Sequence, residues 1–127
     1  MMEVLKMQQL MEENWHLIEE MTEKLKELNP KPCEIILFGS YANGNPTKHS
    51  DIDVVVVLDS DYIVKTHDEK MDRNRPVTMA LIDIIYKIPM DIIVYSKAEV
   101  DYMRKNGYGF IKEVDKTGKV LYGQIVD

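Results

Sequence analysis

The chain has 127 residues, of which 45% are hydrophobic and 30% are charged, a composition typical of one soluble globular domain over residues 1–127. Its formal net charge of −6 disfavours an extended nucleic-acid surface, because such surfaces need rows of Lys and Arg. No apolar stretch approaches the roughly 20 residues that span a bilayer, so no membrane partner is expected. The acidic N-terminus is unlike a signal peptide, and the single cysteine, Cys33, cannot form an internal disulfide. We therefore expect a reduced, cytoplasmic setting.

The first predicted element is an amphipathic helix over residues 8–28. Met11, Ile18 and Leu25 recur every seven residues, and glutamates fill the opposite side. Pro30 follows and ends the helix, because proline cannot continue the hydrogen-bond ladder. We expect this helix to pack on a sheet.

Two short apolar runs, residues 35–38 and 54–58, are predicted to be buried strands. Both are rich in β-branched or aromatic residues and are bounded by Gly, Asn, Pro and Ser. The first run stops at Gly39-Ser40, within a stretch from Gly39 to Gly44 that resembles the start of a P-loop. The Lys and Ser/Thr that must follow the second glycine are absent, so a P-loop NTPase is not expected. The free amides of this turn and the Ser40 hydroxyl can still receive a phosphate, although such a junction is often only a turn.

Two aspartates open the second strand. Asp51 and Asp53 are one residue apart, so in a strand they point the same way, roughly 6.5 Å apart. Carboxylates held that close repel each other unless a cation lies between them, which suggests a divalent metal bound by oxygen ligands. The alternative is that Asp51 caps a turn and Asp53 is an edge residue.

The next segment is predicted to be helical. Thr66 and Glu69 form a capping box that starts a polar helix, and Pro76 must end or kink it. Residues 77–87 then read as a mostly buried helix with Pro76 in its first turn.

The rest of the chain alternates strands and helices. Asp91 opens a third apolar strand, where a lone charge is expensive to bury, although solvation at the strand edge is an alternative. If this strand lies beside the second, three carboxylates converge in a plausible two-metal site. The predicted elements are this strand (90–95), a helix with a Ser96–Glu99 capping box that ends at Asn106-Gly107, a helical turn or two (108–114), a turn (115–118) and a last strand (119–122). The fold class is therefore α/β or α+β, with a small mixed β-sheet packed with helices, the last helix and strand spanning about 97–122.

Taken together, Gly39-Ser40, Asp51-Ile52-Asp53 and the later Asp91 resemble the nucleotidyltransferase fold of the DNA polymerase β superfamily, in particular its small stand-alone minimal nucleotidyltransferases. The resemblance covers a catalytic core of about residues 34–95. It implies that Gly39 and Ser40 hold the β- and γ-phosphates of a nucleoside triphosphate. It also implies that Asp51 and Asp53 bridge two Mg²⁺ ions, and that Asp91 is the third carboxylate, beside the attacking hydroxyl.

The activity implied by the resemblance is transfer of a nucleoside monophosphate, AMP in the first instance, from ATP or another NTP to a hydroxyl acceptor. An RNA end is one possible acceptor. Many minimal members are encoded beside an all-helical partner of the HEPN type, which suggests an antitoxin role. The alternative hypothesis is a non-catalytic binding module that neutralises a partner by masking it.

Two basic segments are candidates for substrate contacts. The connection 59–76 carries Lys65, Lys70, Arg73 and Arg75, which suit an acceptor or phosphate but also a solvated helix. Directly before the acidic pair, Lys48 and His49 suit a triphosphate, although plain loop residues are the favoured interpretation.

Overall fold

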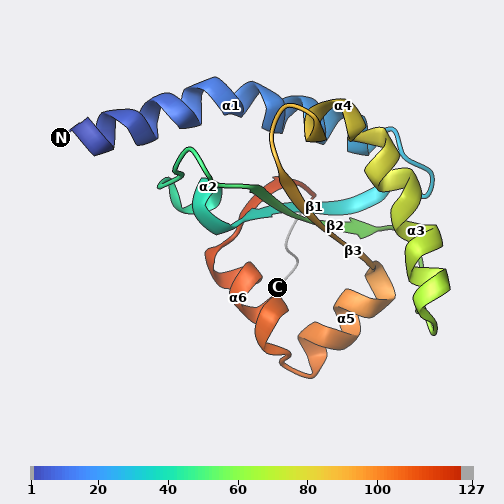
Figure 1. The fold of residues 1–127 in the computed structure, drawn as a ribbon. Helices are drawn as coiled ribbons and strands as arrows, with labels where there is room; N and C mark the ends of the chain where they lie inside the picture. Colours follow the sequence, from blue (N-terminus) through green and yellow to red (C-terminus); the bar gives the residue numbers. More distant parts are fainter. Residues whose placement is uncertain (1, 124–127) are drawn as a thin grey trace.

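The structure is a computed structural model that describes residues 2–123. Figure 1 shows helices packed above and below a sheet. In chain order the elements are α1 (Met2–Lys26), β1 (Pro32–Phe38), α2 (Gly39–Asn43), β2 (Ile52–Leu58), α3 (His67–Ala80), α4 (Ile82–Ile85), β3 (Met90–Ser96), α5 (Lys97–Lys105), α6 (Gly109–Thr117) and β4 (Lys119–Tyr122).

The four strands form one mixed sheet in the order β3-β2-β1-β4. Strands β2 and β3 are parallel, and β1 is antiparallel to both β2 and β4. The parallel pair is connected through α3 and α4, as a parallel connection requires. The predicted α+β class with a small mixed sheet is confirmed.

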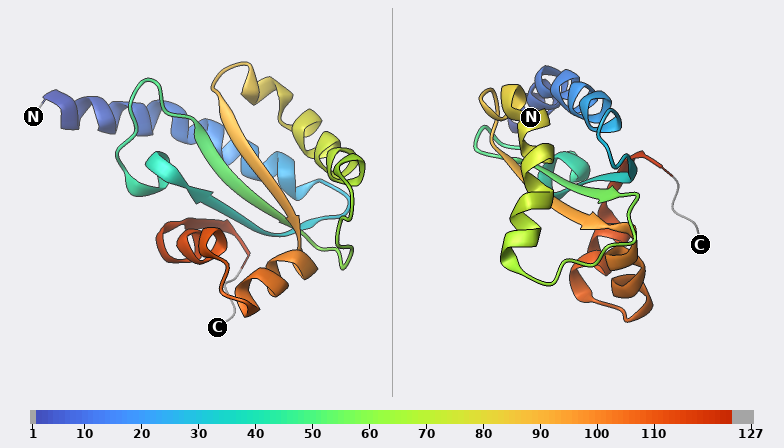
Figure 2. Two further views of the ribbon diagram at one scale, coloured as in Figure 1. Left: turned by 60° about the horizontal axis from the view of Figure 1, so that its bottom comes forward. Right: turned by 90° about the vertical axis from the view of Figure 1, so that its right-hand side faces the viewer.

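Alternate residues of the central strand face two separate apolar layers. Val54 and Val56 pack with residues of α1, α3 and α4, whereas Val55 and Val57 pack with residues of α5 and α6. The run of valines is therefore buried on both faces, which explains why it lacks the polar alternation of a half-exposed strand. Figure 2 shows the sheet between these two groups of helices.

The first helix is longer than its amphipathic pattern predicts. It begins at Met2 rather than near residue 8, and Met2, Val4 and Leu5 are exposed. Its buried residues, Leu17, Ile18, Met21 and Leu25, all lie in the second half, so an apolar stripe marks only that part. Helix-forming residues extend the helix toward Met2, beyond Met11, which is still packed against the core.

Pro76 does not end the helix in which it lies, contrary to the prediction of a new helix over 77–87. Helix α3 continues through Pro76 to Ala80, and the interruption comes at Leu81. Pro76 removes only the hydrogen bond to the Asp72 carbonyl, and both residues are exposed, so water can replace it. The change of direction at Leu81 allows Leu81 and Ile84 both to be fully buried.

The helix ends agree only partly with prediction. The predicted Ser96–Glu99 capping box is complete, with both of its hydrogen bonds. The predicted Thr66–Glu69 box is only half formed. The Thr66 hydroxyl accepts from the Glu69 amide, but the Glu69 carboxylate accepts from the Lys65 amide instead of the Thr66 amide. The predicted turn over 115–118 is wrong, because α6 continues to Thr117 with Ile111 and Val114 buried against the sheet.

Within the part of the chain that the structure describes, no helix combines the length and the apolar character needed to cross a bilayer.

Candidate active site

The three predicted aspartates lie at one end of the sheet, where strands β2 and β3 begin. Asp51 lies directly before β2, Asp53 is its second residue and Asp91 is the second residue of β3. In the parallel pair, Asp53 and Asp91 are register partners. The conditional prediction that β3 lies beside β2 is therefore confirmed, and Asp53 and Asp91 project from the same face of the sheet.

The pKa of Asp53 reports this crowding. It is raised from 3.8 to about 6, first by partial burial and then by the negative charges of Asp91 and Asp51. A carboxylate with two like charges nearby and no cation between them holds its proton more tightly. The three side chains thus form an acidic cluster whose ionised form is favoured by a bound cation.

Gly39 supplies the space that the Asp53 carboxylate occupies. Strand β1 ends at Phe38, whose register partner is Asp53, so Gly39 follows beside the start of β2. A Cβ added to Gly39 would overlap Oδ2 of Asp53, and the φ angle of Gly39 is +72°. Both facts require glycine here, because other residues carry a Cβ and disfavour a left-handed backbone.

We expect Gly39→Ala to lower nucleotidyl transfer at least about 10-fold, because the added methyl group displaces Asp53 and small misplacements of reacting groups are costly. Gly44→Ala is the matched control, since Gly44 has a φ of +77° and nothing lies within 4 Å of its added Cβ. Both variants should lose about 1 kcal/mol of stability in urea unfolding. Equal transfer rates for the two variants would contradict the role assigned to the Gly39–Asp53 contact.

Ser40 is the second residue of the short helix α2, which begins at Gly39. Phe38, which precedes α2, makes no capping hydrogen bond through its side chain. The first backbone amides of α2 therefore have no capping side chain as a partner. Ser40 is partly exposed, and its hydroxyl is free to turn toward a ligand. This arrangement is compatible with the predicted phosphate contact of Gly39 and Ser40.

The donor set suits a hard divalent cation, because carboxylate oxygens are the ligands that Mg²⁺ prefers. Across residues 2–123, however, no three Asp, Glu, His or Cys side chains already stand close enough together to hold a metal ion. Mutual repulsion explains why carboxylates without a cation spread apart. The register of Asp53 and Asp91 and the space at Gly39 place two carboxylates on neighbouring strands, where they would serve as ligands of such a cation.

A cavity of about 490 Å³ opens beside Asp91, along the free edge of β3. Its walls come from the segment before α3, from α3 itself and from α5, and they include Lys70, Arg73 and Tyr102. Lys70 and Arg73 belong to the basic connection noted in the sequence. Tyr102 was not predicted, because only the fold brings α5 to this edge.

Arg73 proves to be a structural anchor. Its guanidinium pairs with Glu99 at 2.5 Å and donates to the Val94 carbonyl at 2.9 Å. Glu99 also accepts from the backbone amides of Ser96 and Val64. These bonds join α3, α5 and the connection after β2, and they leave Lys70 as the freer cation at this cavity.

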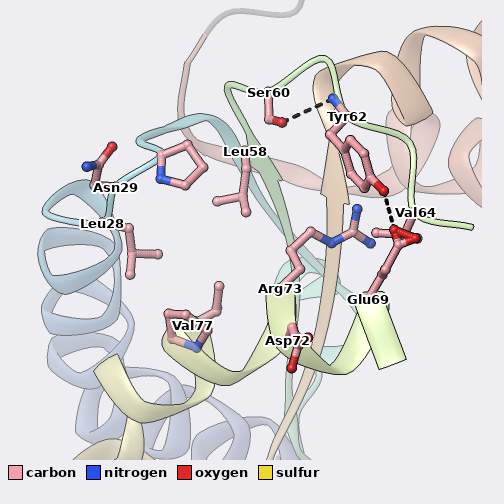
Figure 3. Close-up of a pocket in the computed structure, with 12 residues that line it drawn as sticks. Leu28, Asn29, Leu58, Ser60, Tyr62, Val64, Glu69, Asp72, Arg73 and Val77 are labelled. Carbon is pink, nitrogen blue, oxygen red and sulfur yellow. Dashed lines mark hydrogen bonds between the residues drawn. The ribbon is translucent and has the colours of Figure 1, made fainter. Parts of the chain in front are cut away.

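A second cavity, of about 260 Å³, also has Arg73 in its lining (Figure 3). Leu28, Leu58 and Val77 give it an apolar lining, and Tyr62 donates to the Glu69 carboxylate across its rim. Of the residues predicted to contact substrate only Arg73 lines it, and Gly39, Ser40 and the three aspartates do not. We therefore assign the site to the acidic edge and not to this cavity.

Comparison with known proteins agrees with this geometry. Residues 18–107 match the family model described as a nucleotidyltransferase domain. A relative from Methanocaldococcus jannaschii, named "Putative protein adenylyltransferase", is 35% identical over 91 residues, which are 70% of this chain and 77% of that protein.

Solved structures extend the agreement to the fold. The crystal structure of a "putative nucleotidyltransferase" from Sulfolobus solfataricus aligns with a TM-score of 0.59 at 18% identity, over 94% of this chain and 88% of its own. A chain of a toxin–antitoxin structure, MntA-HpeT, aligns at 24% identity and a TM-score of 0.48, over 84% and 72% of the two chains, which is too weak for inference about partners. On the family match and the sequence relative, the chain belongs to the nucleotidyltransferase domain family and is a nucleotidyltransferase.

Proposed function

We propose that this protein transfers a nucleoside monophosphate, AMP in the first instance, from a nucleoside triphosphate to a hydroxyl acceptor in a Mg²⁺-dependent reaction. The observation that carries the proposal is the pairing of Asp53 with Asp91 across the parallel strands, beside Gly39. The adenylyl group follows the name of the Methanocaldococcus relative.

In this proposal Asp51 and Asp53 hold the divalent cations, two of them by the family resemblance, and Asp91 is the third ligand. Cations bound there would neutralise charge on the triphosphate and align the nucleophile. Side chains and backbone amides of the chain bind the phosphates and orient the acceptor. Gly39 and Ser40 donate hydrogen bonds to the β- and γ-phosphates, and Asp91 orients the acceptor hydroxyl and accepts its proton.

The balance of the reaction is simple. The acceptor oxygen forms a bond to the α-phosphorus, the bond from that phosphorus to the β-phosphate oxygen breaks, and pyrophosphate leaves. The cavity along β3 lies beside Asp91, so we place the acceptor there. Lys70 and Tyr102 would contact it.

The predicted HEPN-type partner, an RNA end as acceptor and the cytoplasmic setting stay predictions.

A labelling experiment tests the reaction. The purified protein with Mg²⁺ and host-cell extract receives ATP labelled on the α-phosphate in one tube and on the γ-phosphate in another. We expect label from the α-phosphate alone on a discrete acceptor, because nucleotidyl transfer keeps only that phosphate. Label from the γ-phosphate alone would mean phosphoryl transfer and would overturn the proposal.

A further inference from the structure

A cavity of about 310 Å³ lies at the same end of the sheet as the aspartates but against α1. Four separate segments form it: the middle of α1, the short helix α2, the turn before β2 and the connection before β3. Figure 2 shows the last two of these rising toward α1 on the same side of the sheet. The polar residues that line it include Asn14, Tyr41, Lys48, His49 and Lys87.

The charge of this cavity is opposite to that of the molecule. Lys48, His49 and Lys87 line it and no carboxylate does, although the chain carries a net charge of −6. Among the residues that the structure describes, neither Lys48 nor Lys87 forms an ion pair, whereas Lys24, Lys26, Arg73 and Arg104 do. Clustered cations repel one another unless an anion lies between them.

Neutral donors complete the cavity. Tyr41 is 2% exposed, and its hydroxyl oxygen accepts a hydrogen bond from the Asn14 amide at 2.8 Å. Because that oxygen is already an acceptor, the hydroxyl hydrogen is available for a ligand. The cavity therefore offers a buried hydroxyl donor together with two lysine cations and the His49 imidazole.

The backbone that carries the cations is fixed. Lys48 and His49 occupy the centre of a turn in which the Ser50 amide donates to the Thr47 carbonyl at 3.0 Å, and the Thr47 amide donates to the Ser50 hydroxyl at 2.8 Å. Across the cavity, the Ile52 amide donates to the Pro89 carbonyl at 3.0 Å and ties the connection that carries Lys87 to β2. The cations thus converge from two braced segments.

We propose that this cavity binds a phosphate group. A phosphate has several acceptor oxygens, so it can interact with two lysines, an imidazole and a hydroxyl donor more completely than a single carboxylate can. The choice of phosphate over another anion rests on the proposed function, in which every nucleotide substrate carries phosphates. The turn is followed by Asp51, and the connection is followed by Met90 and Asp91, so a phosphate held here lies at the same end of the sheet as the aspartates.

Two sources share this chemistry: a free polyphosphate, such as released pyrophosphate, and the backbone of an RNA acceptor. The test uses both probes without Mg²⁺, in EDTA, so that it does not depend on catalysis. Calorimetric titration compares wild type with Lys48→Ala/Lys87→Ala. The matched control is Lys112→Ala/Lys116→Ala, which makes the same charge change at exposed positions on α6.

We expect the cavity variant to bind at least about 10-fold more weakly than the control, since it loses two charged hydrogen-bond donors. Tyr41→Phe, which keeps the buried ring, should weaken binding by a few-fold. Loss for pyrophosphate alone identifies a free polyphosphate, and loss for a short single-stranded RNA identifies the acceptor backbone. Equal binding of both probes by the cavity variant and the control overturns the proposal, whether or not the protein transfers nucleotides.

Discussion

Asp53→Asn is expected to lower nucleotidyl transfer by at least about 10³-fold while making the cation-free protein more stable. The loss follows because Asp53 is assigned to hold the divalent cations, whose charge stabilisation amounts to several kcal/mol, and each 1.36 kcal/mol is a factor of ten in rate. The gain follows because Asp53, Asp91 and Asp51 repel one another, which raises the pKa of Asp53 to about 6.

The sign of the stability effect comes from this raised pKa. Protonated Asp53 is favoured in the folded state, so its stabilising contribution is present below about pH 4 and is lost as the pH rises through about 6. At pH 7 asparagine removes the repulsion. Because solvent screens a partly exposed carboxylate, we expect a gain on the order of 1 kcal/mol.

Two measurements check this prediction. Transfer is followed with α-labelled ATP, and stability by urea unfolding in EDTA. Asp61→Asn, which makes the same charge change at an exposed residue outside the site, is the control and should change neither. An unaltered transfer rate in Asp53→Asn would refute the assignment of this residue.

Arg104→Met is expected to destabilise the fold by about 2–4 kcal/mol. The Arg104 guanidinium donates two hydrogen bonds to Glu34, both at 2.9 Å, and two to Asp115, at 2.8 and 3.0 Å. These bonds join α5 to β1 and α6, and they raise the pKa of Arg104 above its ordinary value. Glu34 is 9% exposed, so removing its partner leaves a nearly buried carboxylate without compensation.

Urea unfolding at pH 7 measures the effect. Arg75→Met is the control, because Arg75 makes one exposed ion pair, with Asp72, and should lose less than about 0.5 kcal/mol. The double variant Arg104→Met/Glu34→Met should recover part of the loss, since it no longer contains the unpaired buried charge. If Arg104→Met were no less stable than Arg75→Met, the network would have no structural role.

Several features of the fold follow from local chemistry and could be predicted. The Ser96–Glu99 capping box has both hydrogen bonds, and the last strand has the predicted limits, Lys119–Tyr122. Strand β2 is the run of valines expected from residues 54–58, extended to Ile52. Each depends on neighbours in sequence, which a linear pattern contains.

Other features depend on the core. The pattern of the first helix ends where its buried face ends, so it could not predict the start at Met2. The sequence pattern also could not show that α3 continues through Pro76. The helix is interrupted at Leu81 instead, where Leu81 and Ile84 are both buried in the core. In both cases tertiary packing outweighs the local preference.

The sequence by itself determined the chemical groups of the candidate site: Gly39-Ser40 after one strand, and aspartates opening two others. Only the tertiary structure decided that Asp53 and Asp91 are register partners and that the Asp53 carboxylate lies over Gly39. It alone gathered Tyr41 and Lys87, which the sequence did not mark, with Lys48 in one cavity. The physical reason is that strand register and the docking of α1 are set by burial of apolar side chains distant in sequence, and no local pattern records those contacts.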